Sequence, residues 1–245
     1  MFARFEGTVR GLPLRAKYAQ ADLLIPELLV EREGRLSMYY APFDWLNRDA
    51  RIILLGITPG WTQMELAYRV ARAAIDTGAG PDAICREAKQ HGAFAGSMRS
   101  NLVRMLDAIG IPAALGITSA ADLFSAARSL LHTSSTIRYP VFVNARNYTG
   151  SPSPVQSAML MRYARTVLAP ELAAVPDAII IPLGQSVERV LRALSDEGYV
   201  DAARWLSGFP HPSGANGHRA RLFAAHRESL MRQVDGRLGI ASRAS

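Results

Sequence analysis

A continuous apolar run at residues 51–57 limits the fold of this chain more than any other stretch. After Arg51 the run consists of Ile, Leu and Gly, and Thr58, Pro59 and Gly60 end it. A strand that is apolar along its whole length is buried on both faces, as a central strand of a parallel sheet is. The run therefore predicts a central strand that ends at a Pro-Gly turn.

Other strand-like and helical segments alternate along the chain. Strands are expected at residues 36–43, with exposed aromatic side chains, and at 141–144, 178–183 and 205–208. Helical spacing of apolar residues predicts helices over 64–75, after 81, over 97–110, through 160 and 167, over 185–195 and over 217–236. Because strands that alternate with helices form parallel sheets, we expect an α/β fold. Its form would be a three-layer α/β/α sandwich with a central, mostly parallel, four-stranded sheet.

The 245 residues are expected to form one domain, because the chain shows no internal repeat, low-complexity segment or linker. Residues 1–34 are interpreted as an N-terminal segment that packs on this domain, and residues 237–245 as a flexible tail. The formal net charge is +7, carried mainly by arginine. Arginine suits phosphate binding, although the codon bias of a high-GC genome explains the same excess equally well.

Several classes of protein and of site are excluded at this stage. The lone Cys85 rules out an internal disulfide, a four-cysteine zinc site and an iron–sulfur site. His91, His132 and His226 are expected at the surface or at helix ends, and no pair of histidines has metal-ligand spacing. The chain has no apolar signal core and no run long enough to span a membrane. We therefore expect a soluble, cytoplasmic, monomeric protein without a cofactor or metal.

The late loop at residues 208–219 is the strongest candidate for a functional site. His211 lies between Pro210 and Pro212, which restrict the backbone on both sides of the imidazole. Glycines follow it, and glycine lets backbone N–H groups approach a ligand closely. In a parallel sheet this loop, residues 58–60 and residues 144–147 would all leave strands at the carboxyl edge, where ligands bind.

In this order, the loops resemble the motifs of the uracil-DNA glycosylase superfamily. Residues 56–60 resemble its strand-end motif Gly-x-x-Pro-Gly, closest to the mismatch-specific and single-strand-selective branches, and residues 211–213 (His-Pro-Ser) resemble its last motif. Residues 181–184 resemble the strand–helix unit before that motif. Phe94 resembles the aromatic residue on which a flipped base stacks, and residues 141–144 resemble the strand that ends in a base-reading asparagine. The resemblance spans about residues 50–235.

The resemblance implies a protein that flips a deaminated or damaged, uracil-like base out of DNA and hydrolyses its N-glycosidic bond. Flipping costs a few kcal/mol, and stacking on Phe94 would recover about 1–3 kcal/mol. Asn144 would pair with the base edge through its amide, and His211 would stabilise the anionic base that departs. The implied catalytic residues are His211 and Thr58, and the implied base-binding residues are Phe94, Asn144, Gly56 and Ile57. The implied DNA-binding residues are Pro59, Gly60, Ser213, Gly214, Ala215, Asn216 and Arg219.

One departure concerns Thr58, which stands where the superfamily carries Asp, Glu or Asn to position the attacking water. A hydroxyl is a poor base, so activity is expected to be low or to recruit a nearby acid, Glu65 or Asp44, between which the sequence does not choose. This departure favours an alternative function, a module that binds lesions without cleaving them. A third alternative, a hydrolase of free nucleosides or nucleotides, is opposed by the flexible and then basic stretch at 214–219.

The central site residues also have ordinary structural explanations. Phe94 would equally serve as a core residue, Asn144 as a turn residue at a strand end, and His211 as a loop histidine. The base, the preference for single- or double-stranded DNA and the oligomeric state are not determined by the sequence.

Overall fold

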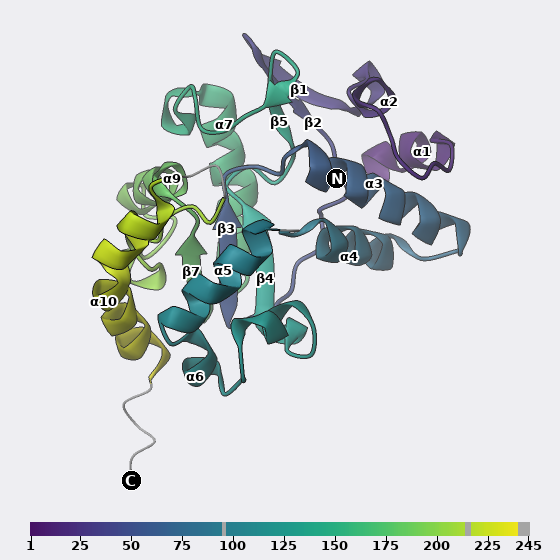
Figure 1. Ribbon diagram of the computed structural model, residues 1–245. Helices are drawn as coiled ribbons and strands as arrows, with labels where there is room; N and C mark the ends of the chain where they lie inside the picture. Colours follow the sequence, from purple (N-terminus) through teal and green to yellow (C-terminus); the bar gives the residue numbers. More distant parts are fainter. Residues whose placement is uncertain (95–96, 214–216, 240–245) are drawn as a thin grey trace. The chain divides into compact units, whose positions relative to one another are not determined.

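The computed structural model describes residues 1–94, 97–213 and 217–239, and within them the chain forms two compact units (Figure 1). Unit 1 comprises Met1–Leu46, Ile57–Ala93 and Ser135–Leu168. Unit 2 comprises Asn47–Gly56, Phe94–Ser134 and the described residues of Ala169–Ser245. Each unit is therefore assembled from stretches that lie far apart in the sequence.

Unit 1 contains an antiparallel sheet with the strand order β1-β2-β5-β6. Its strands are β1 (Leu29–Glu33), β2 (Leu36–Tyr39), β5 (Val141–Val143) and β6 (Arg146–Asn147). Its helical segments are α1 (Phe2–Gly11), α2 (Gln20–Leu23), Pro26–Leu28, α3 (Trp61–Asp76), α4 (Pro81–Gly92), Pro154–Gln156, α7 (Ala158–Tyr163) and the π-helical turn Ala164–Leu168. The apolar stripe predicted on α3 is confirmed, because Met64, Tyr68, Ala71 and Ile75 are all buried.

Aromatic side chains fill much of the core of unit 1. The ring of Phe5, on α1, stacks on the ring of Tyr40 with 4.4 Å between centroids. Tyr39, Tyr40 and Phe43 are all buried, so the expectation of exposed aromatic residues at 36–43 is wrong. The reason is that Tyr40 is covered by Phe5 of α1, which lies more than thirty residues earlier in the chain.

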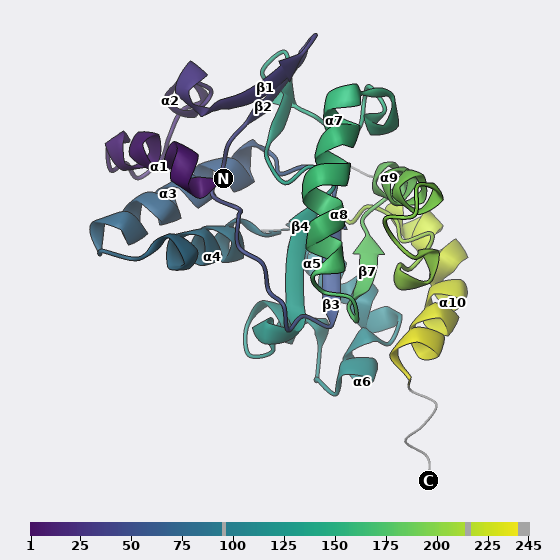
Figure 2. The same cartoon turned by 180° about the vertical axis from the view of Figure 1, so that it is seen from behind.

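Unit 2 is built around a three-stranded parallel sheet with the order β4-β3-β7. Its strands are β3 (Ile52–Gly56), β4 (Leu131–Ser135, the last residue of which belongs to unit 1) and β7 (Ile179–Pro182). Its helical segments are α5 (Ser97–Ala108), α6 (Ile111–Leu115), Ala120–Phe124, Arg128–Leu130, α8 (Ala169–Ala173), α9 (Gln185–Asp196), Ala202–Arg204 and α10 (Arg219–Leu238). Figure 1 shows α5 in front of the strands, and Figure 2, from behind, shows α8 on their other face.

The central strand predicted at residues 51–57 is confirmed as β3, in which Ile52, Ile53, Leu54 and Leu55 are inaccessible to solvent. The mixed α/β class is also confirmed. The expected fourth strand at residues 205–208 is reduced to an isolated parallel bridge between Trp205 and Ile180. Its neighbour Leu206 donates its N–H to the carbonyl oxygen of Ile180 at 2.9 Å.

One of the two neighbours of β3 is β4, a strand that was not predicted from the sequence. Residues 141–144 were expected in that sheet, but β5 pairs antiparallel with β2 in unit 1, so that expectation is wrong. Strand β4 has no apolar run, because it contains the polar residues His132 and Ser134, which are nevertheless buried. The expectation of a surface His132 is therefore wrong as well.

Burial of His132 is possible because its ring is hydrogen-bonded on both sides. Its Nδ1 accepts the N–H of Asn47 at 3.4 Å, and its Nε2 lies 2.6 Å from Oε1 of Glu171. Both side chains are almost completely shielded from solvent. A buried polar group with partners avoids the desolvation cost that an unpaired one carries. These hydrogen bonds therefore allow a histidine within a buried strand.

The C-terminal helix α10 continues to Leu238, beyond the residue 237 at which a tail was expected to begin, and residues 240–245 lie outside the described residues. Leu230 and Val234 are buried on this helix, whereas Phe223 is half-buried. None of the helices in the described ranges combines the length and the apolar character that a membrane span requires.

Candidate functional site

His211 lies in unit 2, where its backbone packs against the turn between β7 and α9. A Cβ atom added to Gly184 would lie 3.1 Å from Cβ of His211, and Gly184 has φ +95°. The N–H of Gly184 also donates to the carbonyl oxygen of Phe209 at 3.1 Å. Glycine suits this position, because other residues rarely adopt this φ and their Cβ would press tightly on the histidine.

The hydrogen bonding of His211 determines its tautomer. The backbone N–H of Ser213 donates to Nδ1 of the imidazole at 3.2 Å, so the neutral ring carries its proton on Nε2. Burial lowers the pKa of His211 from its ordinary value of 6.5, because desolvation disfavours the charged form. The site therefore contains a neutral imidazole whose Nε2–H is a hydrogen-bond donor.

Neighbouring side chains hold the histidine loop. Buried Asn101, on α5, donates from Nδ2 to the carbonyl oxygen of Pro212 at 3.0 Å, and its Oδ1 accepts from Arg104 at 2.5 Å. Arg219 donates from Nη1 to the carbonyl oxygen of Ser213 at 2.6 Å. Asn101 was not predicted as a site residue. Its position beside the apolar stripe of α5 suggests a buried side chain, and a buried amide needs hydrogen-bond partners.

Two of the expected DNA-binding groups in this loop already have protein partners. The Ser213 N–H is bonded to His211, and Arg219 is bonded to its own loop. Gly214, Ala215 and Asn216, also expected to bind DNA, lie outside the described residues. Their expected role in DNA binding stays a prediction.

Phe94 and Gly56, the other expected site residues of unit 2, lie at the ends of elements. Phe94 precedes α5 with φ 39°, and the residue is 7% exposed. Its carbonyl oxygen accepts from Nε of Arg99 at 2.5 Å. This burial fits a core role, and stacking of a base on the ring stays a prediction. Gly56 is the last residue of β3.

Thr58, in unit 1, connects two parts of the chain through its hydroxyl. Oγ1 donates to the carbonyl oxygen of Tyr139 at 2.9 Å and accepts the N–H of Val141 at 3.1 Å. A hydroxyl has one proton to donate, so this donor is already used. The preceding residue, Ile57, accepts the N–H of Ile137 at 3.0 Å through its carbonyl oxygen. The loop after β3 is therefore tied to the segment that leads into β5.

The two acids considered as substitutes for Thr58 are both engaged within unit 1. Buried Glu65 accepts the N–H of Tyr18 at 3.1 Å and Nε–H of Arg69 at 2.8 Å through the same oxygen. Asp44 accepts the hydroxyl groups of Tyr40 at 2.8 Å and of Tyr139 at 2.5 Å. Both carboxylates therefore accept hydrogen bonds from other residues of unit 1, and each has a structural role.

The turn before α3, expected to bind DNA at Pro59 and Gly60, is capped by side chains of unit 1. The N–H of Gly60 donates to Oε1 of Gln63 at 3.0 Å, and the N–H of Trp61 donates to Oδ1 of Asn147 at 2.8 Å. Pro59, in front of them, is buried. A phosphate would have to replace these two acceptors.

Asn144 lies in the turn of the hairpin formed by β5 and β6. Asn144 and Ala145 have φ of 49° and 61°, and both are exposed. Positive φ at both central residues is the conformation of a two-residue type I′ turn, which Asn favours. The position accounts for Asn144 as a turn residue, and the reading of a base edge stays a prediction.

The predicted site residues are thus divided between the units. Unit 1 contains Ile57, Thr58, Pro59, Gly60 and Asn144, and unit 2 contains Gly56, Phe94, His211, Ser213 and Arg219. Unit 2 brings His211, Ser213 and Arg219 into one hydrogen-bonded loop. Unit 1 holds Thr58 to the start of β5 and leaves Asn144 at the exposed end of the same hairpin.

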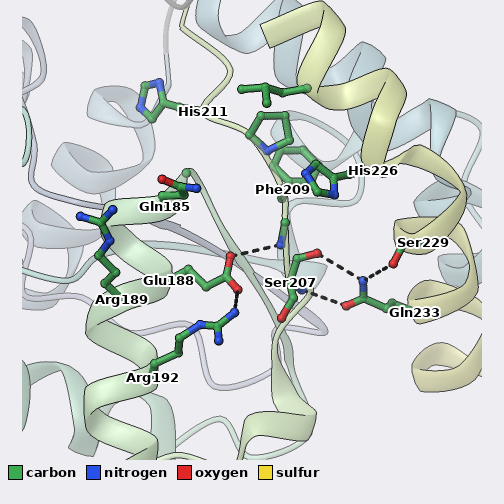
Figure 3. A pocket seen from close by; sticks show the side chains of 14 residues that line it. Gln185, Glu188, Arg189, Arg192, Ser207, Phe209, His211, His226, Ser229 and Gln233 are labelled. Atoms are coloured by element: carbon green, nitrogen blue, oxygen red, sulfur yellow. Dashed lines mark hydrogen bonds and ion pairs between the residues drawn. The ribbon is translucent and has the colours of Figure 1, made fainter. Parts of the chain in front are cut away.

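A pocket of about 680 Å³ opens beside His211, entirely within unit 2 (Figure 3). It is lined by Gly184, Gln185, Glu188, Arg189, Arg192, Ser207, Gly208, Phe209, Pro210, His211, Leu222, His226, Ser229 and Gln233. Sequence analysis did not single out its polar side chains on α9. Their signal is the spacing of Gln185, Arg189 and Arg192, which puts them on one helix face. In the described ranges, no group of three His, Cys, Asp or Glu side chains is arranged to hold a metal ion.

The chain is 42% identical over 233 residues to a protein of Bacillus subtilis (strain 168) that carries the name "Uncharacterized protein YoxB". The matched region covers 94% of this chain and 90% of that protein. No family model matches the chain. No solved structure matches it.

Proposed function

The chain belongs to the same family as the protein YoxB of Bacillus subtilis, and we propose, from the residues of its own site, that this protein is a DNA glycosylase. It binds DNA, holds a deaminated or damaged base outside the helix and hydrolyses the N-glycosidic bond of that base. The observation that carries this proposal is the hydrogen bond from the N–H of Ser213 to Nδ1 of His211, which leaves the proton of the neutral ring on Nε2. The order of the motifs at residues 56–60, 181–184 and 211–213 supports it.

The chemistry requires a donor that is neutral before the reaction. Breaking the N-glycosidic bond leaves negative charge on the base and positive charge on the sugar. A preorganised donor such as Nε2–H of His211 stabilises the developing anion without a change in its own position. A cationic imidazole would also repel the positive sugar, so the lowered pKa of His211 suits the task.

The proposal includes the finer architecture of the fold. The bridge at Trp205 occupies the position of a fourth strand beside β7. We include in the proposal that the sheet of unit 2 is the central sheet of a three-layer α/β/α fold of the uracil-DNA glycosylase type.

The test is single-turnover cleavage of oligonucleotides that carry uracil, hypoxanthine or a mismatched thymine. We expect His211→Ala to slow cleavage about 100-fold or more, the effect of losing one preorganised donor, while DNA binding stays close to wild type. His91→Ala is the matched control, because His91 is an exposed imidazole at the end of α4. Cleavage by His211→Ala at the wild-type rate would contradict the assignment.

A second function, binding of a damaged base without cleavage, is favoured by the hydrogen bonds of Thr58. Its proton is donated to Tyr139, and Glu65 and Asp44 are engaged by other residues. Wild-type protein that binds lesion DNA more tightly than undamaged DNA, and releases no base in prolonged incubation, would support this function. Release of any of the tested bases would exclude it.

A further inference from the structure

The pocket beside His211 continues as a groove between α9 and α10. One wall carries Gln185, Arg189 and Arg192, which are spaced i, i+4 and i+7 along α9. The opposite wall is formed by residues of α10, namely Leu222, His226, Ser229 and Gln233. Figure 3 shows the labelled residues of the two walls on either side of the segment that leads to His211.

Hydrogen bonds hold the floor of this groove in place. Gln233 accepts the N–H of Ser207 at 2.8 Å and donates to the carbonyl oxygen of the same residue at 3.2 Å. Glu188 accepts the N–H of Gly208 at 3.1 Å. A Cβ atom at Gly208 would lie 3.2 Å from Nδ1 of His226, so the imidazole rests directly on the floor. The groove is therefore preformed.

The charge of the groove is suited to an anion. Among its lining residues, Glu188 is the one carboxylate, and its oxygens accept from Gly208 and, at 2.7 Å, from Nη2 of Arg192. Arg189 is exposed, and none of the hydrogen bonds or ion pairs among the described residues involves it. A guanidinium group with unused donors binds phosphate oxygens in a fixed geometry.

The groove begins at the histidine that we assign to the departing base. Gly184, Gln185 and His211 line one end, and Arg192 and Gln233 line the groove farther along α9 and α10. An α-helix rises about 1.5 Å per residue, so α9 covers about 10 Å from Gln185 to Arg192. This length is sufficient for contact with more than one phosphate of a nucleic acid strand.

We propose that the groove between α9 and α10 binds the phosphodiester backbone of the DNA strand next to the base at His211. Arg189 and Arg192 contact its phosphates, and the partly polar wall of α10 faces the sugars. The identification of the strand as DNA rests on the proposed function. The groove itself is defined by charge, shape and continuity with His211.

The test is binding of a labelled, undamaged single-stranded oligonucleotide, measured by fluorescence anisotropy across a salt series. Each lost phosphate contact flattens the slope of log K against log salt by about 0.7 on a single strand. We expect a flattening of about 0.7 for Arg189→Ala and about 1.4 for the double variant Arg189→Ala/Arg192→Ala. The matched control is Arg221→Ala/Arg232→Ala, which removes two exposed arginines of α10 that do not line the groove.

The single variant Arg189→Ala is included because loss of Arg192 breaks its ion pair with Glu188 and could disturb the fold. Arg189 is exposed, so its replacement should leave the fold intact. Slopes and affinities of the groove variants equal to those of the control would overturn the proposal. Competition by poly-L-glutamate as strong as that by the oligonucleotide would also overturn it, in favour of an acidic peptide.

An undamaged strand has no base to excise. The binding assay therefore tests the groove separately from the cleavage assay, which tests the proposed function. Arg189-dependent binding of this strand supports the groove even if no lesion is cleaved. Lesion cleavage by a wild-type protein whose binding does not depend on Arg189 or Arg192 removes the groove proposal and leaves the proposed function intact.

Discussion

The side-chain amide of Asn101 donates a hydrogen bond to the carbonyl oxygen of Pro212 at 3.0 Å. Asn101 lies on α5, 111 residues before Pro212 in the chain, and it is buried. The bond joins a helix to the loop that carries His211. Because a second bond from Arg104 orients the amide, Asn101 acts as a positioning residue for the imidazole.

Replacing Asn101 by Asp is expected to loosen this loop. A carboxylate still accepts from Arg104 but cannot donate to Pro212, and an unsatisfied buried group costs about 1–3 kcal/mol. Urea denaturation should show this loss for Asn101→Asp. NMR titration should show a rise in the pKa of His211, because water enters and because the new carboxylate favours the imidazolium. Ser100→Ala, at an exposed neighbouring position, is the control and should change neither. An unchanged pKa of His211 would argue against the positioning role.

Protonation of His211 should destabilise the fold as the pH falls. Its pKa is lower in the folded protein than its ordinary value of 6.5, because burial disfavours the cation. The unfolded chain therefore binds a proton first. The free energy of unfolding should decrease as the pH falls below about 6.5 and stop decreasing below the folded-state pKa. Chemical denaturation at several pH values should show this decrease reduced in His211→Gln. Parallel curves for the two proteins would contradict the assignment.

The hydroxyl of Thr58 should be needed for stability. Thr58→Val keeps the shape of the side chain but leaves the N–H of Val141 and the carbonyl oxygen of Tyr139 without this partner. We expect a loss of about 1–3 kcal/mol. Thr58→Ser retains the hydroxyl and should lie close to wild type in thermal or urea denaturation. Equal stability of the Val and Ser variants would show that the two bonds contribute nothing net.

The hairpin turn at Asn144 permits a separation of structural and recognition roles. Ala145 has φ 61°, a conformation that costs an L-residue about 1–2 kcal/mol, so Ala145→Gly should stabilise the protein slightly. Asn144→Gly also preserves the turn, because Gly adopts positive φ freely, but it removes the amide. Loss of lesion preference in Asn144→Gly, with preference retained in Ala145→Gly, would support base reading by Asn144. Retained preference in both variants would make Asn144 a turn residue only.

Local patterns in the sequence were sufficient for several elements. The apolar run of β3 and the helical spacing on α3, α9 and α10 identified these elements, because burial on both faces of a strand or on one face of a helix is encoded by neighbouring residues. The Pro-flanked His211 and the turn at Gly184 were also visible, since both depend on backbone restrictions that act within a few residues.

Pairing between distant segments was decided only by the tertiary structure. Strand β4 is stable beside β3 because Asn47 and Glu171 satisfy His132 from distant parts of the chain, and no window around His132 contains them. The pairing of β5 with β2 could not be predicted from a local pattern, because the partner strand lies about a hundred residues earlier. The same holds for the hydroxyl of Thr58, whose partners are more than eighty residues away. A side chain's type states which bonds it can form, whereas the three-dimensional packing determines which of them it forms.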